Sequence, residues 1–157
     1  MTVVRALEEL PDYSLVISSA RSVFVDQFLQ EVKGLAMEHR VKHVGRLSDE
    51  DLRRWYAKAT AVVQPSLSEG FGLTGVEAMA AGIPVIASNL PIFKEIYQEY
   101  ASFFDPHDPS DLARVVKSMD NQATDLAQAQ AFVRRYSWDS MAEETLNSYE
   151  KALHQRR

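Results

Sequence analysis

The chain has 157 residues, a net charge of −5 at pH 7, 46% hydrophobic residues and 25% charged residues, which is the balance of one ordinary globular domain. Lysine and arginine never form a run longer than a pair, so neither a nucleic acid nor an anionic membrane surface is expected as the main partner. The absence of cysteine excludes disulfides, thiolate metal sites and cysteine nucleophiles, and it is compatible with the reducing cytoplasm, where we expect the protein.

Neither a membrane span nor a signal peptide is predicted. No apolar run approaches the roughly 18 residues that a transmembrane helix needs. The first part of the chain contains Glu8, Glu9 and Asp12, which is unlike a secretory signal.

Short β-branched runs alternate with longer segments of helical period, and this pattern predicts an α/β fold built from βαβ units. The runs are mostly apolar, as expected for strands that helices cover on both faces. Strands are predicted at residues 14–19, 41–44, 61–64 and 84–88, with a short fifth one at 101–105. We therefore expect a doubly wound parallel sheet with flanking helices.

Capping residues mark the predicted helices between and after these strands. Ser48 followed by Asp51 is typical of a helix start, and Asp108 precedes a proline at the first helical position. Gly82 is expected to end a helix, and Ser137 to cap the last one. Helices are predicted over residues 22–38, after Ser48, over 74–81, from Asp108 and over about 138–153.

The stretch SEGFGLTGVEAM, residues 68–79, contains the glycine spacing G-x-G-x-x-G of dinucleotide-binding turns. In such folds the glycine turn follows its strand directly, and an acid that binds the ribose ends the next strand. Here residues 65–69 separate the strand from Gly70, and Asn89 and Leu90 follow the next strand. An NAD-binding domain is therefore the less favoured alternative.

Two glutamates flank these glycines: Glu69 enters the loop, and Glu77 lies in or just after the first helical turn. Glycines let the backbone approach a ligand closely, and free N–H groups at a helix N-terminus favour anions. Carboxylates accept hydrogen bonds from sugar hydroxyls. The layout suits a nucleoside-diphosphate sugar, with hydroxyls at both ends and a diphosphate between them. The same residues also fit a solvated loop acid and a favourable first-turn charge.

The segment QPSLSEGFGLTGVEAMAAGIPVIAS resembles the donor-binding segment of retaining glycosyltransferases of the GT-B fold (glycosyltransferase family 4, or glycosyl transferases group 1). In that family a proline-serine pair, an E-x7-E with a GFG loop, an EAMA-type helix and a G-x-P-V-x-x-S strand follow in this order, and all are present here. HVGRLSDEDLRRWYAKA, FKEIYQEYASFFDPHDPSDLARVV and YSWDSMAEETLNSYEKAL are similar to neighbouring segments of the family. The resemblance covers most of residues 5–153.

The resemblance implies transfer of a hexose from a UDP- or GDP-sugar to an acceptor, with retention at the anomeric carbon and without a metal or other cofactor. It implies that Glu69 is the catalytic residue and contacts hydroxyls of the donor sugar, and that Glu77 binds the ribose. Backbone groups implied to face the sugar and the diphosphate belong to Gly70, Phe71, Gly72, Leu73 and Thr74. The turn implied to lie along the nucleobase comprises Gly45, Arg46 and Leu47.

The sequence departs from the family pattern in two ways. Gly75 stands in the first helical turn, where many members have proline or a bulky residue, and it costs about 1 kcal/mol of helix propensity. The N-terminal acceptor domain, and the first strand of the donor domain with its G-R-L-x-x-x-K turn, have no counterpart in residues 1–157, which begin at the following helix. We therefore expect a single nucleotide-sugar-binding domain, 1–157, that is the donor half of an enzyme and is inactive alone. A stand-alone sugar-nucleotide-binding module is the alternative.

Three further features have structural interpretations. Asp49, Glu50 and Asp51 open a helix beside Ser48, so capping and the helix dipole explain them, and no metal site is predicted. Trp138 is interpreted as a packing residue. Arg21 follows a predicted strand at a carboxyl-end position, where it is either a surface cation or a contact to the nucleotide.

Overall fold

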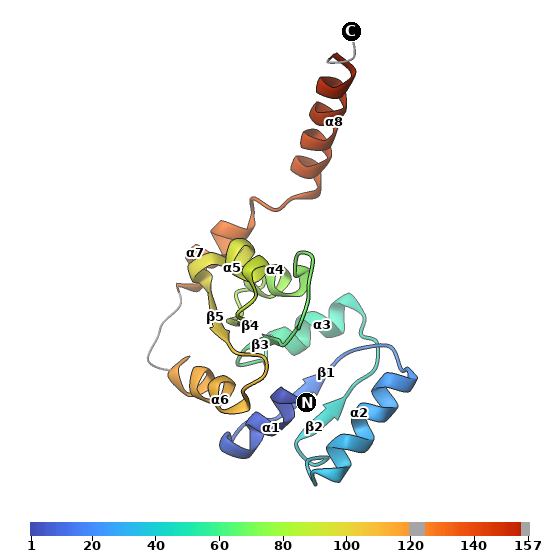
Figure 1. Cartoon of the computed structure of the whole chain (residues 1–157), viewed down its shortest axis with the longest axis vertical. Helices are drawn as coiled ribbons and strands as arrows, with labels where there is room; N and C mark the ends of the chain where they lie inside the picture. The colour runs from blue at the N-terminus through green and yellow to red at the C-terminus, as the bar shows by residue number, and fades with distance from the viewer. Residues whose placement is uncertain (120–124, 155–157) are drawn as a thin grey trace.

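The computed structural model describes residues 1–119 and 125–154 (Figure 1). In this part of the chain every predicted strand is present, each one to three residues shorter than the apolar run that predicts it. The strands are β1 (Leu15–Ile17), β2 (Val41–His43), β3 (Val62–Gln64), β4 (Val85–Ser88) and β5 (Ala101–Phe104).

The strands are all parallel, but their hydrogen bonds divide them into two sheets. β1 pairs with β2, and β3, β4 and β5 form a second sheet in that order. Leu15 lies opposite Val41 in the first sheet, and Val85 lies between Val62 and Ala101 in the second. Helical crossovers connect the parallel strands, as a doubly wound α/β fold requires. The predicted fold class is confirmed. β1 and β3, the neighbouring edges of the two sheets, form no hydrogen-bonded pair with each other.

The helices lie before, between and after the strands. The α-helices are α1 (Thr2–Ala6), α2 (Val23–Gly34), α3 (Asp49–Tyr56), α4 (Leu73–Ala80), α5 (Pro91–Tyr97), α6 (Pro109–Ser118), α7 (Leu126–Val133) and α8 (Trp138–His154), with 3-10 turns η1 (Leu7–Glu9) and η2 (Gln98–Tyr100). The side chains of Ser48, Asp108 and Ser137 accept first-turn N–H bonds of α3, α6 and α8 at 3.1, 2.9 and 3.1 Å. These predicted caps are confirmed.

Two helices were not predicted from the sequence. α5 begins at Pro91 after Leu90, which offers no side-chain cap, so the start signal is a proline alone. α7 is rich in alanine and glutamine and buries only Ala129 and Val133, so its apolar period is weak. α2 also ends at Gly34, earlier than predicted, because the chain turns through Ala36 with a φ of +55°.

The core is built around β4, which is buried along its whole length. Val85 and Ala87 pack with α4 and α5 on one face, while Ile86 packs with α6 on the other. The alternation follows from the two-residue period of a strand. This two-sided burial explains the continuous apolar run in the sequence, and it fixes the carboxyl end of β4 beside the loop that precedes α4.

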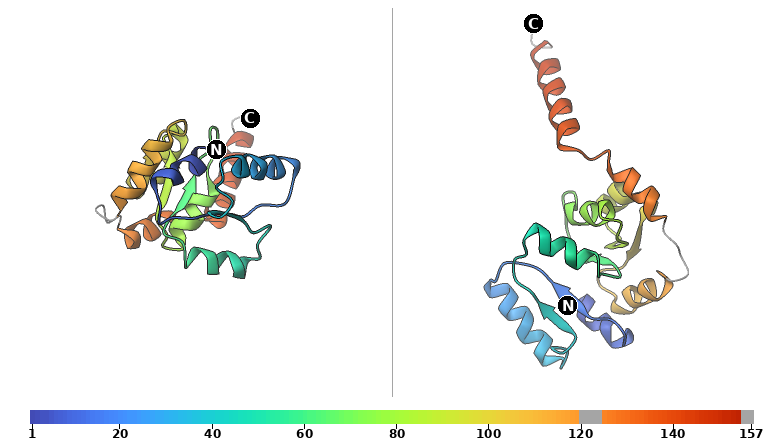
Figure 2. Two further views of the ribbon diagram at one scale, coloured as in Figure 1. Left: turned by 90° about the horizontal axis from the view of Figure 1, so that it is seen from below. Right: turned by 180° about the vertical axis from the view of Figure 1, so that it is seen from behind.

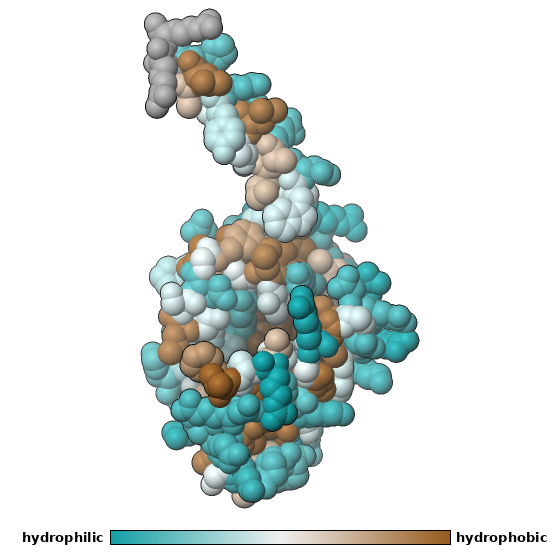
Figure 3. Space-filling model, turned by 90° about the vertical axis from the view of Figure 1, so that its right-hand side faces the viewer, coloured by the Kyte–Doolittle hydropathy of each residue, from teal (hydrophilic) through white to brown (hydrophobic). Residues whose placement is uncertain are grey.

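Helix α8 projects from the body of the domain, as Figure 1 and the right-hand view of Figure 2 show. None of its residues is buried, and its apolar side chains are visible along it in Figure 3. Trp138 is 72% exposed, so its interpretation as a packing residue is wrong. Across residues 1–119 and 125–154, no helix combines the length and the apolar character needed to span a membrane.

Candidate functional site

The loop between β3 and α4, residues 65–72, ends in a left-handed glycine. We call this segment the glycine loop. Gly72 is the N-cap of α4 and has a φ of +95° and a ψ of +49°, a conformation that strains any residue with a side chain. A Cβ atom at Gly72 would lie 2.7 Å from Cε1 of Phe93, and one at Gly75 would lie 2.5 Å from Cζ of Tyr97. Both glycines are therefore required by the close approach of α5.

The first two N–H groups of α4 belong to Leu73 and Thr74, where the glycine loop ends. Among the described residues, no carbonyl or capping side chain accepts a hydrogen bond from the N–H of Leu73 or Thr74. The N–H of Gly75 bonds to the carbonyl of Gly72 at 3.1 Å. Leu73 and Thr74 are both exposed. Two donors at the positive end of a helix are thus open to an anion.

Glu69 lies on the glycine loop itself and is exposed. Its carboxylate accepts hydrogen bonds from the N–H of Gly70 at 3.3 Å and from the hydroxyl of Ser66 at 3.5 Å. Both bonds are long, so the carboxylate retains acceptor capacity toward a ligand. The carboxylate is also close enough to the buried hydroxyl of Tyr97 to help raise its pKa, after the larger effect of burial.

Glu77 lies on the exposed face of α4, one turn beyond the open N–H groups. Its charge contributes, after burial, to raising the pKa of Tyr56 at the end of α3. The two glutamates are therefore placed on either side of the N-terminus of α4, one before the helix and one after its first turn.

The turn at Gly45, Arg46 and Leu47 follows β2 and is tied to the end of β1. The carbonyl of Gly45 accepts hydrogen bonds from the hydroxyl of Ser18 and the N–H of Ser19, each at 3.1 Å. Gly45 has a φ of +74°, which explains the glycine. Arg46 is exposed and Leu47 is half-buried. The turn therefore lies at the carboxyl ends of the first sheet, where open α/β sheets bind ligands.

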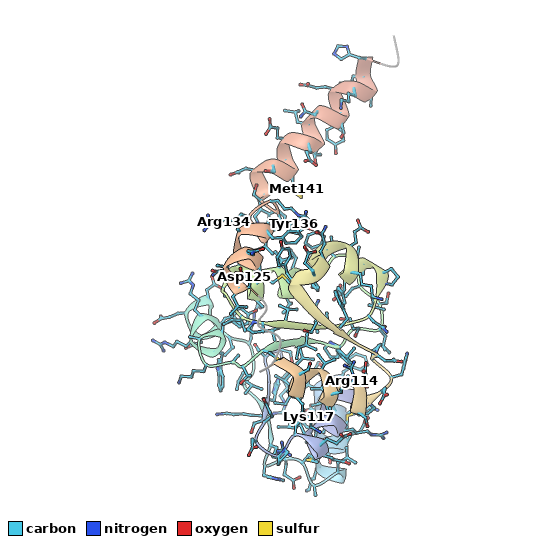
Figure 4. The ribbon with its side chains drawn as sticks, turned by 90° about the vertical axis from the view of Figure 1, so that its left-hand side faces the viewer. Arg114, Lys117, Asp125, Arg134, Tyr136 and Met141 are labelled. Carbon is cyan, nitrogen blue, oxygen red and sulfur yellow. The ribbon has the colours of Figure 1, made fainter. Side chains whose placement is uncertain are left out.

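Phe71 anchors the glycine loop to Tyr136, which follows α7. Its half-buried ring meets the edge of Tyr136 at a centroid distance of 5.2 Å and an interplanar angle of 87°. Tyr136 lies where the body joins α8, as Figure 4 shows. The hydroxyl of Tyr136 donates to the carbonyl of Ile96 at 3.1 Å. One side of the Phe71 ring thus packs within the protein.

Two of the three acids at the start of α3 are held by protein groups. Asp51 accepts a hydrogen bond from Ser48 at 2.8 Å, and Arg54 forms ion pairs with Asp51 and Glu50 at 3.4 and 2.6 Å. Within the described residues, no cluster of three or more histidine or acidic side chains has the arrangement of a metal site. Arg21 is paired with Asp26 at 2.6 Å.

Three residues near the site were not assigned to it from the sequence: Gln64, Tyr97 and Tyr56. Gln64 and Tyr97 lie behind the glycine loop, 6% and 0% exposed, and Tyr56 faces Glu77 from α3. The signal for Tyr97 was the spacing of Gly72 and Gly75, because residues three apart share one side of a helix. Two glycines on one side indicate a close neighbour, although they do not identify it.

The parallel strands, their helical crossovers and a glycine loop opening onto a helix N-terminus define a doubly wound α/β domain with a candidate anion site. The family model described as "Glycosyl transferases group 1" matches residues 2–135. The chain therefore belongs to the glycosyl transferases group 1 family.

Relatives and solved structures agree with this assignment. The O-antigen chain mannosyltransferase RfbU of Salmonella typhimurium is 32% identical over 129 residues, which are 82% of this chain and 36% of that protein. Sucrose-phosphate synthase from Thermosynechococcus elongatus superimposes with a TM-score of 0.85 and 26% identity, over 98% of this chain and 42% of that one. HepE of Anabaena, solved with UDP and glucose, has the same fold, with a TM-score of 0.83 and 22% identity over 95% of this chain and 44% of that one. The chain thus spans less than half the length of these proteins.

Proposed function

We propose that the chain is the donor-binding part of a retaining glycosyltransferase that moves a hexose from a nucleoside-diphosphate sugar to an acceptor. One observation carries this proposal: two open N–H groups at the start of α4 lie between two exposed carboxylates, Glu69 and Glu77. Membership of the glycosyl transferases group 1 family supports it. So does the fold shared with HepE, which was solved with UDP and glucose.

Each part of the site takes one part of the donor. The N–H groups of Leu73 and Thr74 bind the diphosphate, where the helix dipole stabilises the charge of the leaving group. Glu77 accepts hydrogen bonds from the ribose hydroxyls. Glu69 accepts hydrogen bonds from the sugar hydroxyls and, as the catalytic residue, orients the hexose for transfer. The backbone of Gly70, Phe71 and Gly72 lines the sugar and the phosphate.

The nucleobase lies along Gly45, Arg46 and Leu47 in this arrangement. The turn is fixed to the end of β1 by Ser18 and Ser19. A fixed backbone turn can present its peptide groups to a base edge without rearrangement, which favours binding. The substrate is a UDP- or GDP-sugar.

No cofactor takes part in the proposed reaction, and the donor binds without a metal ion. Of the three acids that open α3, Glu50 and Asp51 are engaged by Arg54 and Ser48. The chemistry instead depends on positioning and on hydrogen bonds to the departing diphosphate. We place the reaction in the cytoplasm.

The division between the two sheets supports a further strand in the complete domain. On β1, the backbone groups of Leu15 and Ile17 form the hydrogen bonds to β2 and its flanking residues. The N–H and C=O groups of Val16, between them, therefore face away from β2. On β3, Val62 bonds toward β4, so Val63 faces away from it. A parallel strand from outside residues 1–157 fits between β1 and β3 and gives the order 3-2-1-4-5-6 of doubly wound sheets. We include this strand, and an acceptor domain, in the active protein.

Calorimetric titration of the chain with UDP-glucose, GDP-mannose and NAD tests the proposal. We expect heat of binding from at least one sugar nucleotide and weaker or no binding of NAD. Preference for NAD would overturn the assignment and restore the dinucleotide alternative. An assay of donor hydrolysis and transfer then separates the two forms of the proposal, because turnover by these 157 residues alone would rule out a module that is inactive by itself.

A further inference from the structure

Tyr97 is the largest fully buried side chain of the domain, and its hydroxyl lies directly behind the glycine loop. Tyr97 belongs to α5, which the sequence does not connect to the site. Its ring stacks on Phe93 with centroids 5.1 Å apart and planes 18° from parallel. On the other side the ring lies against the backbone of Gly72 and Gly75, where no Cβ atom would fit. The hydroxyl therefore cannot change position unless the loop moves with it.

The Tyr97 hydroxyl contacts the carbonyl of Gly72 at 2.6 Å and the side-chain oxygen of Gln64 at 2.5 Å. A phenol has one hydrogen, and the amide of Gln64 can present either an acceptor or a donor. All three groups are satisfied when the Gln64 amide is turned so that its nitrogen donates to Tyr97 and Tyr97 donates to Gly72. Burial, and then the charge of Glu69, raise the pKa of Tyr97 well above its usual range, so the hydroxyl keeps its proton.

The carbonyl of Gly72 shares a peptide plane with the N–H of Leu73. In a trans peptide these two groups point in opposite directions. Because Tyr97 holds the carbonyl from inside the protein, the N–H of Leu73 is directed outward. A carbonyl that accepts a hydrogen bond also polarises its peptide group and makes the N–H a better donor. The same carbonyl accepts hydrogen bonds from the N–H groups of Gly75 and Val76 at 3.1 and 3.4 Å, so the buried hydroxyl adds the shortest of three hydrogen bonds that fix the direction of this exposed donor.

We infer that Tyr97 is a positioning residue, which aims the N–H of Leu73 at the diphosphate of the donor by holding the carbonyl of Gly72. The inference rests on the proposed function for the identity of the ligand. Tyr97 touches no ligand itself and acts through one peptide group. Its effect is therefore confined to the diphosphate and does not extend to the ribose, which Glu77 binds.

The test is Tyr97→Phe, which keeps the stacked ring and removes only the hydroxyl. Tyr100→Phe is the matched control, because it also removes one hydroxyl from a ring that packs in the core, on Phe132, and not from the carbonyl of Gly72. Affinities are measured by calorimetry for UDP, GDP, uridine and guanosine, at a temperature where circular dichroism shows every variant folded. Amide hydrogen exchange of Leu73 is followed by NMR without ligand.

We expect Tyr97→Phe to lower the affinity for the nucleoside diphosphate about three- to tenfold, because a misdirected donor loses most of one hydrogen bond. Binding of the nucleoside should change less than about twofold. The Leu73 amide should exchange faster in this variant and not in Tyr100→Phe. If Tyr97 had only a structural role, Tyr97→Phe would lower the affinities for the diphosphate and the nucleoside equally, or would change neither.

The outcomes separate this inference from the proposed function. If the parent chain binds UDP or GDP and Tyr97→Phe binds it equally well, the positioning role is overturned and the proposed function stands. Equal losses for the diphosphate and the nucleoside also overturn it. If the parent binds neither nucleotide, the proposed function fails. In that case amide hydrogen exchange still tests the role of Tyr97. If Leu73 exchanges at the same rate in Tyr97→Phe and in the parent, Tyr97 does not position this peptide group.

Discussion

Gly75 and Tyr97 form a complementary pair, in which the missing side chain of one makes room for the ring of the other. A Cβ atom on Gly75 would lie 2.5 Å from Cζ of Tyr97 and closer still to its hydroxyl. The glycine that departs from the family pattern is thus explained by a residue on another helix. The same contact places the Tyr97 hydroxyl next to the first turn of α4.

Gly75→Ala should therefore destabilise the domain although alanine is the better helix former. Overpacking a buried contact costs about 1–3 kcal/mol, which outweighs about 1 kcal/mol of gained helix propensity. The matched control is Gly34→Ala, because nothing lies within 4 Å of a Cβ there. Urea unfolding should show a lower free energy of unfolding for Gly75→Ala and an unchanged or higher one for Gly34→Ala. Equal stability of Gly75→Ala and the parent would contradict the packing of Tyr97.

Substitutions of the two glutamates should separate nucleotide binding from sugar discrimination. Glu77→Ala removes the ribose acceptor and should weaken UDP or GDP about tenfold, the loss of a charge-assisted hydrogen bond. Glu69→Ala should leave nucleotide affinity nearly unchanged and reduce the preference for sugar nucleotide over nucleotide. Both side chains are exposed, so stability should stay within about 0.5 kcal/mol of the parent.

Glu144→Ala is the control for these two variants, because it removes an exposed glutamate from α8. Calorimetry with each nucleotide and its sugar nucleotide measures both effects. If each of the two variants, Glu77→Ala and Glu69→Ala, binds the sugar nucleotide as tightly as the parent does, the assigned roles are wrong.

Asp111 should make stability depend on pH in the acid range. A hydrogen bond from the N–H of Asp105, at 2.8 Å, and then the side chain of Arg114 lower the pKa of Asp111 below its ordinary value of 3.8. Because folding lowers this pKa, the stabilisation is complete above the unfolded value and is lost as the pH falls through the folded value. Asp111→Ala should lower the free energy of unfolding by about 1 kcal/mol at pH 7, and the difference should vanish below the folded pKa.

Asp111→Asn is the comparison that separates charge from hydrogen bonding. Its amide oxygen can still accept from Asp105, while the ion pair with Arg114, 2.6 Å in the parent, is lost. The loss at pH 7 should be smaller than for Asp111→Ala. A difference between parent and Asp111→Ala that is the same at pH 7 and pH 3 would contradict the assignment.

Helix α8 should contribute little to the stability of the body. None of its residues is buried, and Trp138, Leu146 and Leu153 are more than half exposed. A chain that ends after Ser137 should unfold within about 2 °C of the parent, less than the shift that 1 kcal/mol typically produces in a domain of this size. Differential scanning calorimetry measures this. A fall of several degrees would mean that α8 packs on the domain in solution.

The fold was largely predictable from the sequence, because its signals are local. Strands such as β4 are continuous apolar runs between helices, and Ser48 and Asp108 mark helix starts by side-chain caps. α5 and α7 escaped prediction because a proline start and an alanine-glutamine repeat give weak signals. The division between β1 and β3 was also not predicted, since strand pairing depends on contacts between distant segments.

For the site, the sequence located the glycine loop and its two acids but not the residues that support them. Glu69 and Glu77 are recognisable because their spacing around glycines is local. Tyr97 and Gln64 are brought behind the loop by α5 and β3, and no local pattern marks a buried polar pair. Trp138 was misassigned because hydrophobicity alone does not reveal whether a neighbour covers a helix.

The most direct test of the central claim, that the start of α4 between Glu69 and Glu77 binds a sugar nucleotide, is an NMR titration of backbone amides. The isotope-labelled chain is titrated with UDP-glucose and separately with GDP-mannose. We predict that one of them shifts the amides of Leu73 and Thr74 most, with smaller shifts at Gly70 and Gly45. Saturable shifts centred on α2 or α6, with Leu73 and Thr74 unmoved, would contradict the account.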